Sequence, residues 1–198
     1  MKTTLESTNE ILRRLGKGPV SALHVGPLAT RVQRMLEDES RALQREGWHF
    51  NTKYGVTIDP NVNSKYDVTA LESTPIFHID TDGVDFSKNF VRQGDFLYDL
   101  DNNTDIVTGS LIVTYSYELG YESIPEAFQD WAMAKAALAL APQLGASGPE
   151  LQVLTLTLQR AETTARRDEM RRSDVNVLET REAVAIRGRR RMGWRSLY

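Results

Sequence analysis

Apolar residues recur at the spacing of an α-helix in two segments at the start of the chain. In the first segment Ile11, Leu12 and Leu15 form one apolar face, and Thr3 with Glu6 three positions later has the form of a capping box. Glycine and proline at positions 16–19 end this helix. The second helix spans residues 27–47, and its apolar stripe consists of Leu28, Val32, Met35, Leu36 and Leu43.

The helical period returns in two segments after residue 122. Ser123 and Glu126 form another capping-box pattern, and an alanine-rich run then continues to residue 141. A further box, Ser147 with Glu150, opens a long helix whose apolar period fades after residue 172. The spacing of three and four residues along this helix predicts a packing seam of Leu151, Leu154, Leu158, Ala161 and Ala165.

Between the helical segments the apolar period changes to two, from residue 48 to residue 118. Short alternations occur at residues 54–58 and 77–79, and the longest one runs through Leu111, Val113, Tyr115 and Tyr117. Asx and glycine residues at 59–61, 82–83 and 101–103 favour tight turns between these strands. This block predicts a small antiparallel sheet or barrel.

Together these patterns predict an α+β fold. Two N-terminal and two C-terminal helices form an antiparallel helical bundle from residues 1–47 and 123–175. A small antiparallel β domain is inserted at residues 48–122, and residues 176–198 form an extended C-terminal tail.

Composition narrows the classes of function. The 198 residues include no cysteine, which excludes disulfides, thiolate metal sites and cysteine nucleophiles. No apolar run is long enough to span a membrane and the N-terminus has no apolar signal core, so we expect a soluble protein without a membrane anchor, made in the cytosol. The net charge of −3 is unevenly distributed, because residues 57–107 hold ten acids against three bases, while residues 183–198 hold five arginines and no acid.

Motifs for catalysis or cofactor binding are weak throughout. His24, His49 and His78 are isolated and lack zinc-ligand spacing, so we interpret them as structural or surface residues. Gly16-Lys17 lacks the strand and the hydroxyl residue of a P-loop, and the acids at 99–103 fit a hairpin turn better than a calcium loop. We therefore expect no catalytic residue, no metal and no cofactor.

The basic C-terminal tail has three interpretations. It is a solvated, disordered end, a nucleic-acid-binding segment, or a docking peptide that becomes ordered on a partner. Large apolar side chains are unusual in a purely solubilising tail, which favours docking. The residues predicted to bind the partner are Arg187, Arg189, Arg190, Arg191, Trp194 and Tyr198.

Several local motifs, taken in order, resemble the tail tubular protein A family of T7-like podoviruses, the adaptor beneath the portal. They cover the helical segments, about half of the chain, whereas the β block matches only in position and length. The motifs are Asn9-Glu-Ile-Leu12, Leu15-Gly16, Pro19-Val-Ser21 with Leu23, Gly47-Trp48-His-Phe50-Asn51, Ile124-Pro-Glu126 with Phe128, Trp131 and Lys135-Ala136, and Gly148-Pro-Glu150.

The resemblance implies a structural virion protein in the phage tail, made in the host cytoplasm. Twelve copies form a ring between the portal and a tail nozzle similar to tubular protein B, and the ring lines the channel through which genomic DNA passes without sequence-specific binding. Trp48, Phe50, Phe128 and Trp131 are then core residues rather than catalytic ones.

Two other classes remain open at this stage. A tail-associated peptidoglycan or polysaccharide hydrolase would use a pair of carboxylates, one of them with a raised pKa. A DNA-binding protein would use the arginines of the tail and bind duplexes with strong salt dependence.

Overall fold

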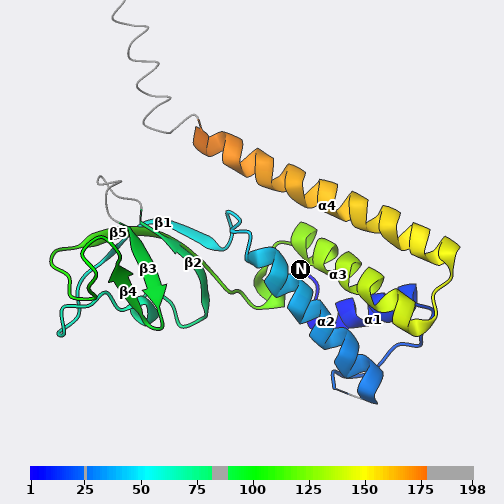
Figure 1. The fold of residues 1–198 in the computed structure, drawn as a ribbon. Coiled ribbons are helices and arrows are strands. Elements are labelled where there is room, and N and C mark those ends of the chain that lie inside the picture. The colour runs from blue at the N-terminus through cyan, green and yellow to red at the C-terminus, as the bar shows by residue number, and fades with distance from the viewer. Residues whose placement is uncertain (25, 82–88, 178–198) are drawn as a thin grey trace, which may run out of the picture.

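A computed structural model describes residues 1–24, 26–81 and 89–177. Within these residues the chain forms four α-helices and small antiparallel sheets, which confirms the mixed helix and sheet class predicted from the sequence (Figure 1). The α-helices are α1 Thr4–Arg14, α2 Gly26–Gln44, α3 Glu126–Leu140 and α4 Gly148–Val177. The strands are β1 Thr52–Ile58, β2 Ile76–Asp80, β3 Phe90–Gln93, β4 Phe96–Asp99 and β5 Leu111–Tyr117, and short 3-10 helices lie at Val68–Ala70, Tyr121–Ser123 and Ala141–Leu144.

Both ends of α1 form as its sequence predicts. The hydroxyl of Thr3 accepts from the N–H of Glu6, and the Glu6 carboxylate accepts from the N–H of Thr3, so the capping box is complete. At the other end Lys17 N–H donates to the Leu12 carbonyl, while Gly16 has a φ of 66°. This reversal is a helix C-cap, and it explains the Gly-Lys pair without a phosphate site.

Helix α3 is the centre of the helical part, because it contacts α1, α2 and α4. It is buried nearly all round, since its alanines allow the neighbouring helices to approach closely. Trp48, Phe128 and Trp131 are buried at one end of this core, and the Phe128 ring centroid lies 4.9 Å from that of Trp48 and 4.7 Å from that of Phe50. The core role predicted for these four aromatic residues is confirmed.

The two other predicted capping boxes have different outcomes. At α3 the prediction is wrong, because Pro125 is the N-cap residue and Ser123 ends a 3-10 helix. Pro125 favours an extended conformation for Ile124, so the helix cannot include Ser123 or Ile124 and begins at Glu126. At α4 the Glu150 carboxylate accepts from the N–H and hydroxyl of Ser147, at 2.6 and 2.7 Å, so the carboxylate half of that box is formed.

The β part has its own hydrophobic core. In the described chain β5 is the central strand of a sheet with the order β1-β5-β2, and β3 pairs with β4 in a separate hairpin, so this part forms sheets rather than a closed barrel. The core between them includes Tyr66, Val68, Leu97, Val113 and Tyr115. The sequence predicts β1, β2 and β5 but not the hairpin.

Two buried carboxamides join the helical part to the sheet. Asn51 accepts from the N–H of Trp48 and donates to the carbonyls of Gln44 and Tyr117. The Gln44 side chain in turn exchanges two hydrogen bonds with the backbone of Leu119, at 2.9 and 2.7 Å. The chain therefore enters and leaves the sheet at one junction, where these two side chains supply hydrogen-bond partners to backbone groups.

Candidate functional site

The acidic and histidine side chains of the described residues can be checked for metal-ligand clusters. Among the described residues no group of three or more His, Asp or Glu side chains is close enough to hold a metal ion. Asp99 accepts from the N–H groups of Asp101 and Asn102, so these acids build a turn, as the sequence favours. In the same described part of the chain, no helix has the length and hydropathy of a membrane span.

The three histidines belong to separate segments of the chain and have structural or surface settings. His24 and His78 are exposed, and His24 has a left-handed backbone with a φ of 62°. His49 is half-buried against the aromatic core, where its N–H donates to the Glu169 carboxylate at 3.2 Å and its Nδ1 also pairs with that carboxylate. His49 therefore links the start of the β part to α4.

Carboxyl groups with a raised pKa would favour the hydrolase hypothesis. Hydrogen bonds instead lower the pKa of five described carboxyl groups, namely Glu6, Glu10, Asp105, Glu122 and Glu150. A general acid needs a pKa near the working pH, so none of these five groups suits that role.

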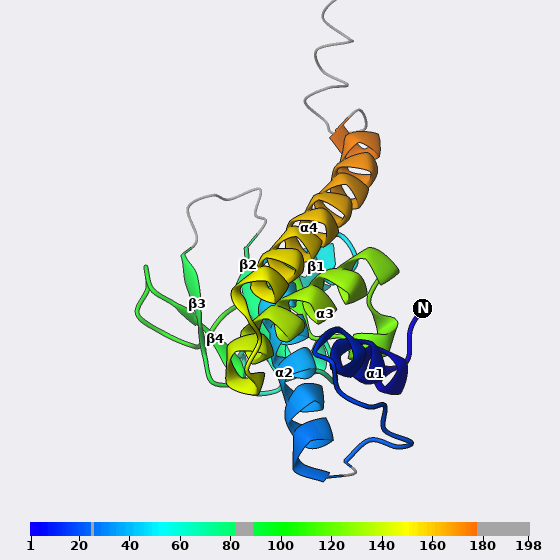
Figure 2. The same cartoon turned by 90° about the vertical axis from the view of Figure 1, so that its right-hand side faces the viewer.

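Helix α4 has a long exposed surface beside the face that packs on α3. One face packs on α3 through Leu154 and Ala165, with Leu151, Leu158 and Ala161 beside them, which confirms the predicted seam. Helix α4 lies along the outside of the helical part (Figures 1 and 2), and most of its other described side chains are exposed. Its exposed apolar side chains are Val153, Leu156 and Met170, which are 63, 54 and 63% exposed. Val153 and Leu156 are three residues apart and so are neighbours on the helix surface, whereas Met170 lies about 21 Å further along it.

Polar contacts hold the second half of α4 against the core. The Arg166 guanidinium lies 5.2 Å from the Trp131 ring centroid and 5.8 Å from that of Trp48, and it pairs with Glu162 at 2.9 Å. Three residues further on, Glu169 holds His49. These contacts fix the direction in which α4 extends from the helical part.

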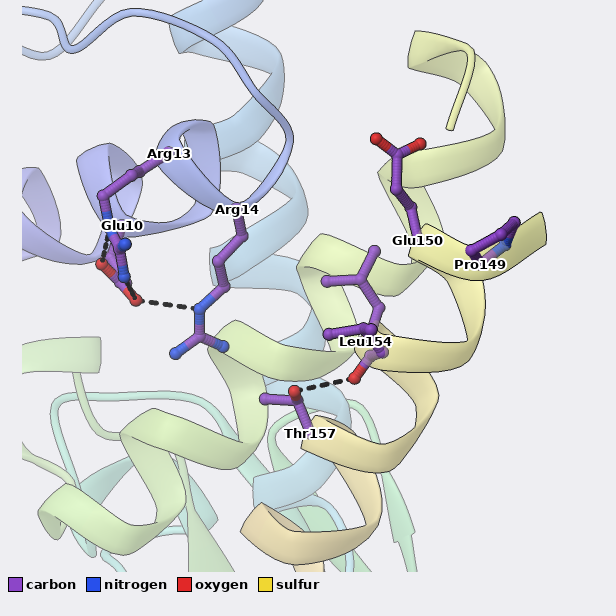
Figure 3. A pocket seen from close by; sticks show the side chains of 8 residues that line it. Glu10, Arg13, Arg14, Pro149, Glu150, Leu154 and Thr157 are labelled. Atoms are coloured by element: carbon purple, nitrogen blue, oxygen red, sulfur yellow. Dashed lines mark hydrogen bonds and ion pairs between the residues drawn. The ribbon is translucent and has the colours of Figure 1, made fainter. Parts of the chain in front are cut away.

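A cavity of about 470 Å³ lies between the end of α1 and the first half of α4 (Figure 3). Leu154 and Thr157 line its α4 side, and Glu10, Arg13 and Arg14 line its α1 side. Glu10 accepts from Arg13 at 2.7 and 2.9 Å and from Arg14 at 2.9 Å, so its charge is neutralised within α1. These hydrogen bonds, that of Arg13 first, lower the pKa of Glu10 to about 2.

This lowered pKa predicts a pH dependence of stability. The ionised Glu10 stabilises the fold above the unfolded-state pKa of 4.5, and this contribution is lost as the pH falls toward 2. We expect Glu10→Gln to remove about 1 kcal/mol of the stability difference between pH 6 and pH 2.5, since the group is partly screened by solvent. Urea unfolding at the two pH values measures this.

The matched control is Glu46→Gln, because Glu46 is exposed and has no ion pair within the described chain. It should leave the acid dependence unchanged. Equal acid dependence in the wild type and in Glu10→Gln would show that the Arg13 and Arg14 contacts contribute nothing to folding.

A flank of arginines continues along α4 beyond this cavity. Arg160 lines a second cavity of about 220 Å³ together with Arg14 and Ala127, and Arg167 and Arg171 line a third of about 440 Å³ beside Glu126. The three arginines are exposed. Our sequence analysis did not identify them, although their spacing of seven and four residues places them on one side of a helix.

The arginine-rich tail was the surface predicted from the sequence. Its candidate residues, Arg187, Arg189, Arg190, Arg191, Trp194 and Tyr198, lie outside the described residues, so their docking role stays a prediction.

Comparison with protein families gives a match over most of the chain. The model of a family described as tail tubular protein matches residues 5–175, from the first turn of α1 to the last turn of α4. The match therefore includes the helical core, the described strands and the arginine flank. No significant match was found among curated proteins.

Proposed function

Because the chain belongs to the tail tubular protein family, which makes it a structural component of a phage tail, we propose that it is a ring-forming adaptor. In this proposal about twelve copies join the portal to the tail nozzle and line the channel through which DNA leaves the capsid. The observation that carries the proposal is the family match, because it spans 171 of the 198 residues and includes both hydrophobic cores.

The fold supports a division of the chain into two domains and an extension. We propose that residues 1–47 and 123–175 form one antiparallel helical bundle domain, that residues 48–122 form the β domain, and that residues 176–198 form the extension. The two separate hydrophobic cores favour this division, because each can be stable through its own buried residues.

The extension is the proposed contact with the portal. Arg187, Arg189, Arg190 and Arg191 would face acidic groups of the portal, while Trp194 and Tyr198 would fill apolar pockets. A nozzle protein would contact another surface of the ring.

The net negative charge of the chain suits a channel for DNA. Twelve copies with a net charge of −3 each give a ring of −36, and acids that face the lumen would keep DNA from adhering as it passes. A lumen lined mainly by Lys and Arg would contradict this orientation.

Native mass spectrometry of the purified protein, alone and mixed with its portal ring, tests the proposed function. We expect a monomer or small oligomer alone and a closed ring of about twelve copies on the portal, because the portal raises the effective concentration of neighbouring copies. An absence of binding at every salt concentration would overturn the adaptor role. Assays for release of reducing sugar would then test the hydrolase hypothesis.

A further inference from the structure

Three arginines on α4 have no acidic partner within the described chain. Arg160, Arg167 and Arg171 lie on one flank of the helix, about 10 and 6 Å apart along its axis. The acids beside them have other partners: Asp130 pairs with Lys2, Asp168 with Arg172, and Glu126 with the N-terminal amino group at 3.8 Å. The flank therefore keeps a net positive charge.

An acidic counterpart lies at the end of the three-stranded sheet that is remote from the helices. Asp59 follows the last residue of β1 and Asp80 is the last residue of β2, on either side of the first half of β5. Both side chains are exposed, and neither has a Lys or Arg partner in the part of the chain that the structure describes. The nearby bases are engaged elsewhere, since Lys53 pairs with Glu72 and Lys65 with Asp105.

One copy of the chain cannot bring these two surfaces together. The cavities that the arginines share with residues of α1 and α3 show that the flank lies on the α1 side of α4. Helix α4 packs on α3, whereas Asp59 and Asp80 belong to the β part, which lies at the left of Figure 1. The positive and negative surfaces thus lie on different parts of one copy, and a head-to-tail contact between identical copies, as in a closed ring, can pair them.

We infer that Arg160, Arg167 and Arg171 bind Asp59 and Asp80 of a neighbouring copy of this chain. Val153 precedes Arg160 by seven residues, so it lies on the same flank and adds exposed apolar area to the contact. This inference rests on the proposed ring, and it identifies the surfaces by which adjacent copies meet. Opposite charges at such a contact also set its register and reject wrong pairings.

Charge reversal on each surface tests the inference, with ring formation on the portal measured by native mass spectrometry. Arg167→Glu with Arg171→Glu should reduce closed rings at least tenfold, and so should Asp59→Lys with Asp80→Lys. The chain that carries all four substitutions should form rings again, because each contact then has reversed but matching charges. Unchanged melting temperatures would show that every variant folds.

The matched control is Arg31→Glu with Arg34→Glu, which makes the same charge change on two exposed arginines of α2 and should leave ring formation intact. If the charge-reversed variants form rings as readily as the wild type does, this inference is overturned, while the proposed function stands. Failure of the fourfold variant to recover would also overturn it. A loss of binding to a short DNA duplex with unchanged rings would assign the flank to nucleic acid instead. An absence of rings from the wild type would overturn the proposed function itself.

Discussion

Phe128→Ala should lower the free energy of unfolding by about 3–5 kcal/mol and the melting temperature by about 10 °C. Phe128 is fully buried, and its ring lies against Trp48, Phe50 and Trp131. Removal of the ring leaves a cavity at the centre of this cluster, which the backbone of α3 cannot close because the helix also packs on α1, α2 and α4. Urea or thermal unfolding followed by circular dichroism measures the loss.

The same substitution should also loosen α4. Arg166 lies over the rings of Trp48 and Trp131, so a shift of these rings into the cavity would weaken its contact. Tyr54→Ala is the control, because Tyr54 is 69% exposed and its removal leaves no cavity. It should change stability by less than about 0.5 kcal/mol. A loss below about 1 kcal/mol for Phe128→Ala would mean that the Phe128 ring is not tightly packed in the aromatic cluster.

Local signals in the sequence predict the helices and most of the strands. The capping box of Thr3 and Glu6 forms as predicted, because the two residues are the N-cap and part of the first turn of α1 and no distant residue is needed. The predicted box at Ser123 fails because it neglects how Pro125 restricts the residue before it. The β3–β4 hairpin has a usable signal that our prediction missed: Gly94 and Asp95 separate two short alternating runs, and Gly94 takes a φ of 63°.

Long-range features had no local signal. β5 is the central strand because it pairs with β1 and β2, and β1 lies more than 50 residues away in the chain. Nothing in the sequence distinguishes three polar residues, Gln44, Asn51 and Gln129, from exposed ones. Each is nevertheless buried and hydrogen-bonded to the backbone of another segment. Which polar residue is buried depends on the backbone groups that the fold leaves without partners, and only the folded chain shows those.

The candidate site likewise has one feature that the sequence predicts and one that it does not. The seam of α4 follows from its apolar spacing, and the structure confirms it. The arginine flank on the same helix is visible in the sequence as a spacing, but its importance depends on which nearby acids are already paired. That pairing involves Lys2 and the N-terminus, more than 120 residues from the acids that they hold.

Deletion of residues 184–198 should abolish binding to the portal and leave the fold intact. The deletion removes five arginines and changes the net charge from −3 to −8, and it also removes Trp194 and Tyr198. Arginine forms paired hydrogen bonds with carboxylates, and a tryptophan anchored in a pocket alone contributes about 2 kcal/mol or more to binding. The family match ends at residue 175, so the deleted segment lies beyond the part shared with the family. Surface plasmon resonance on the immobilised portal measures the binding.

Three full-length variants separate the contributions of the tail. Trp194→Ala should weaken binding at least tenfold, and exchange of Arg187, Arg189, Arg190 and Arg191 for lysine should weaken it less, because charge is kept while the planar fork of donors is lost. Ser196→Ala is the silent control in the same segment. Undiminished binding by the deleted chain would assign portal recognition to residues 1–183. A lower melting temperature after deletion would instead show that the tail contributes to folding, because a segment that only docks adds nothing to the stability of the free protein.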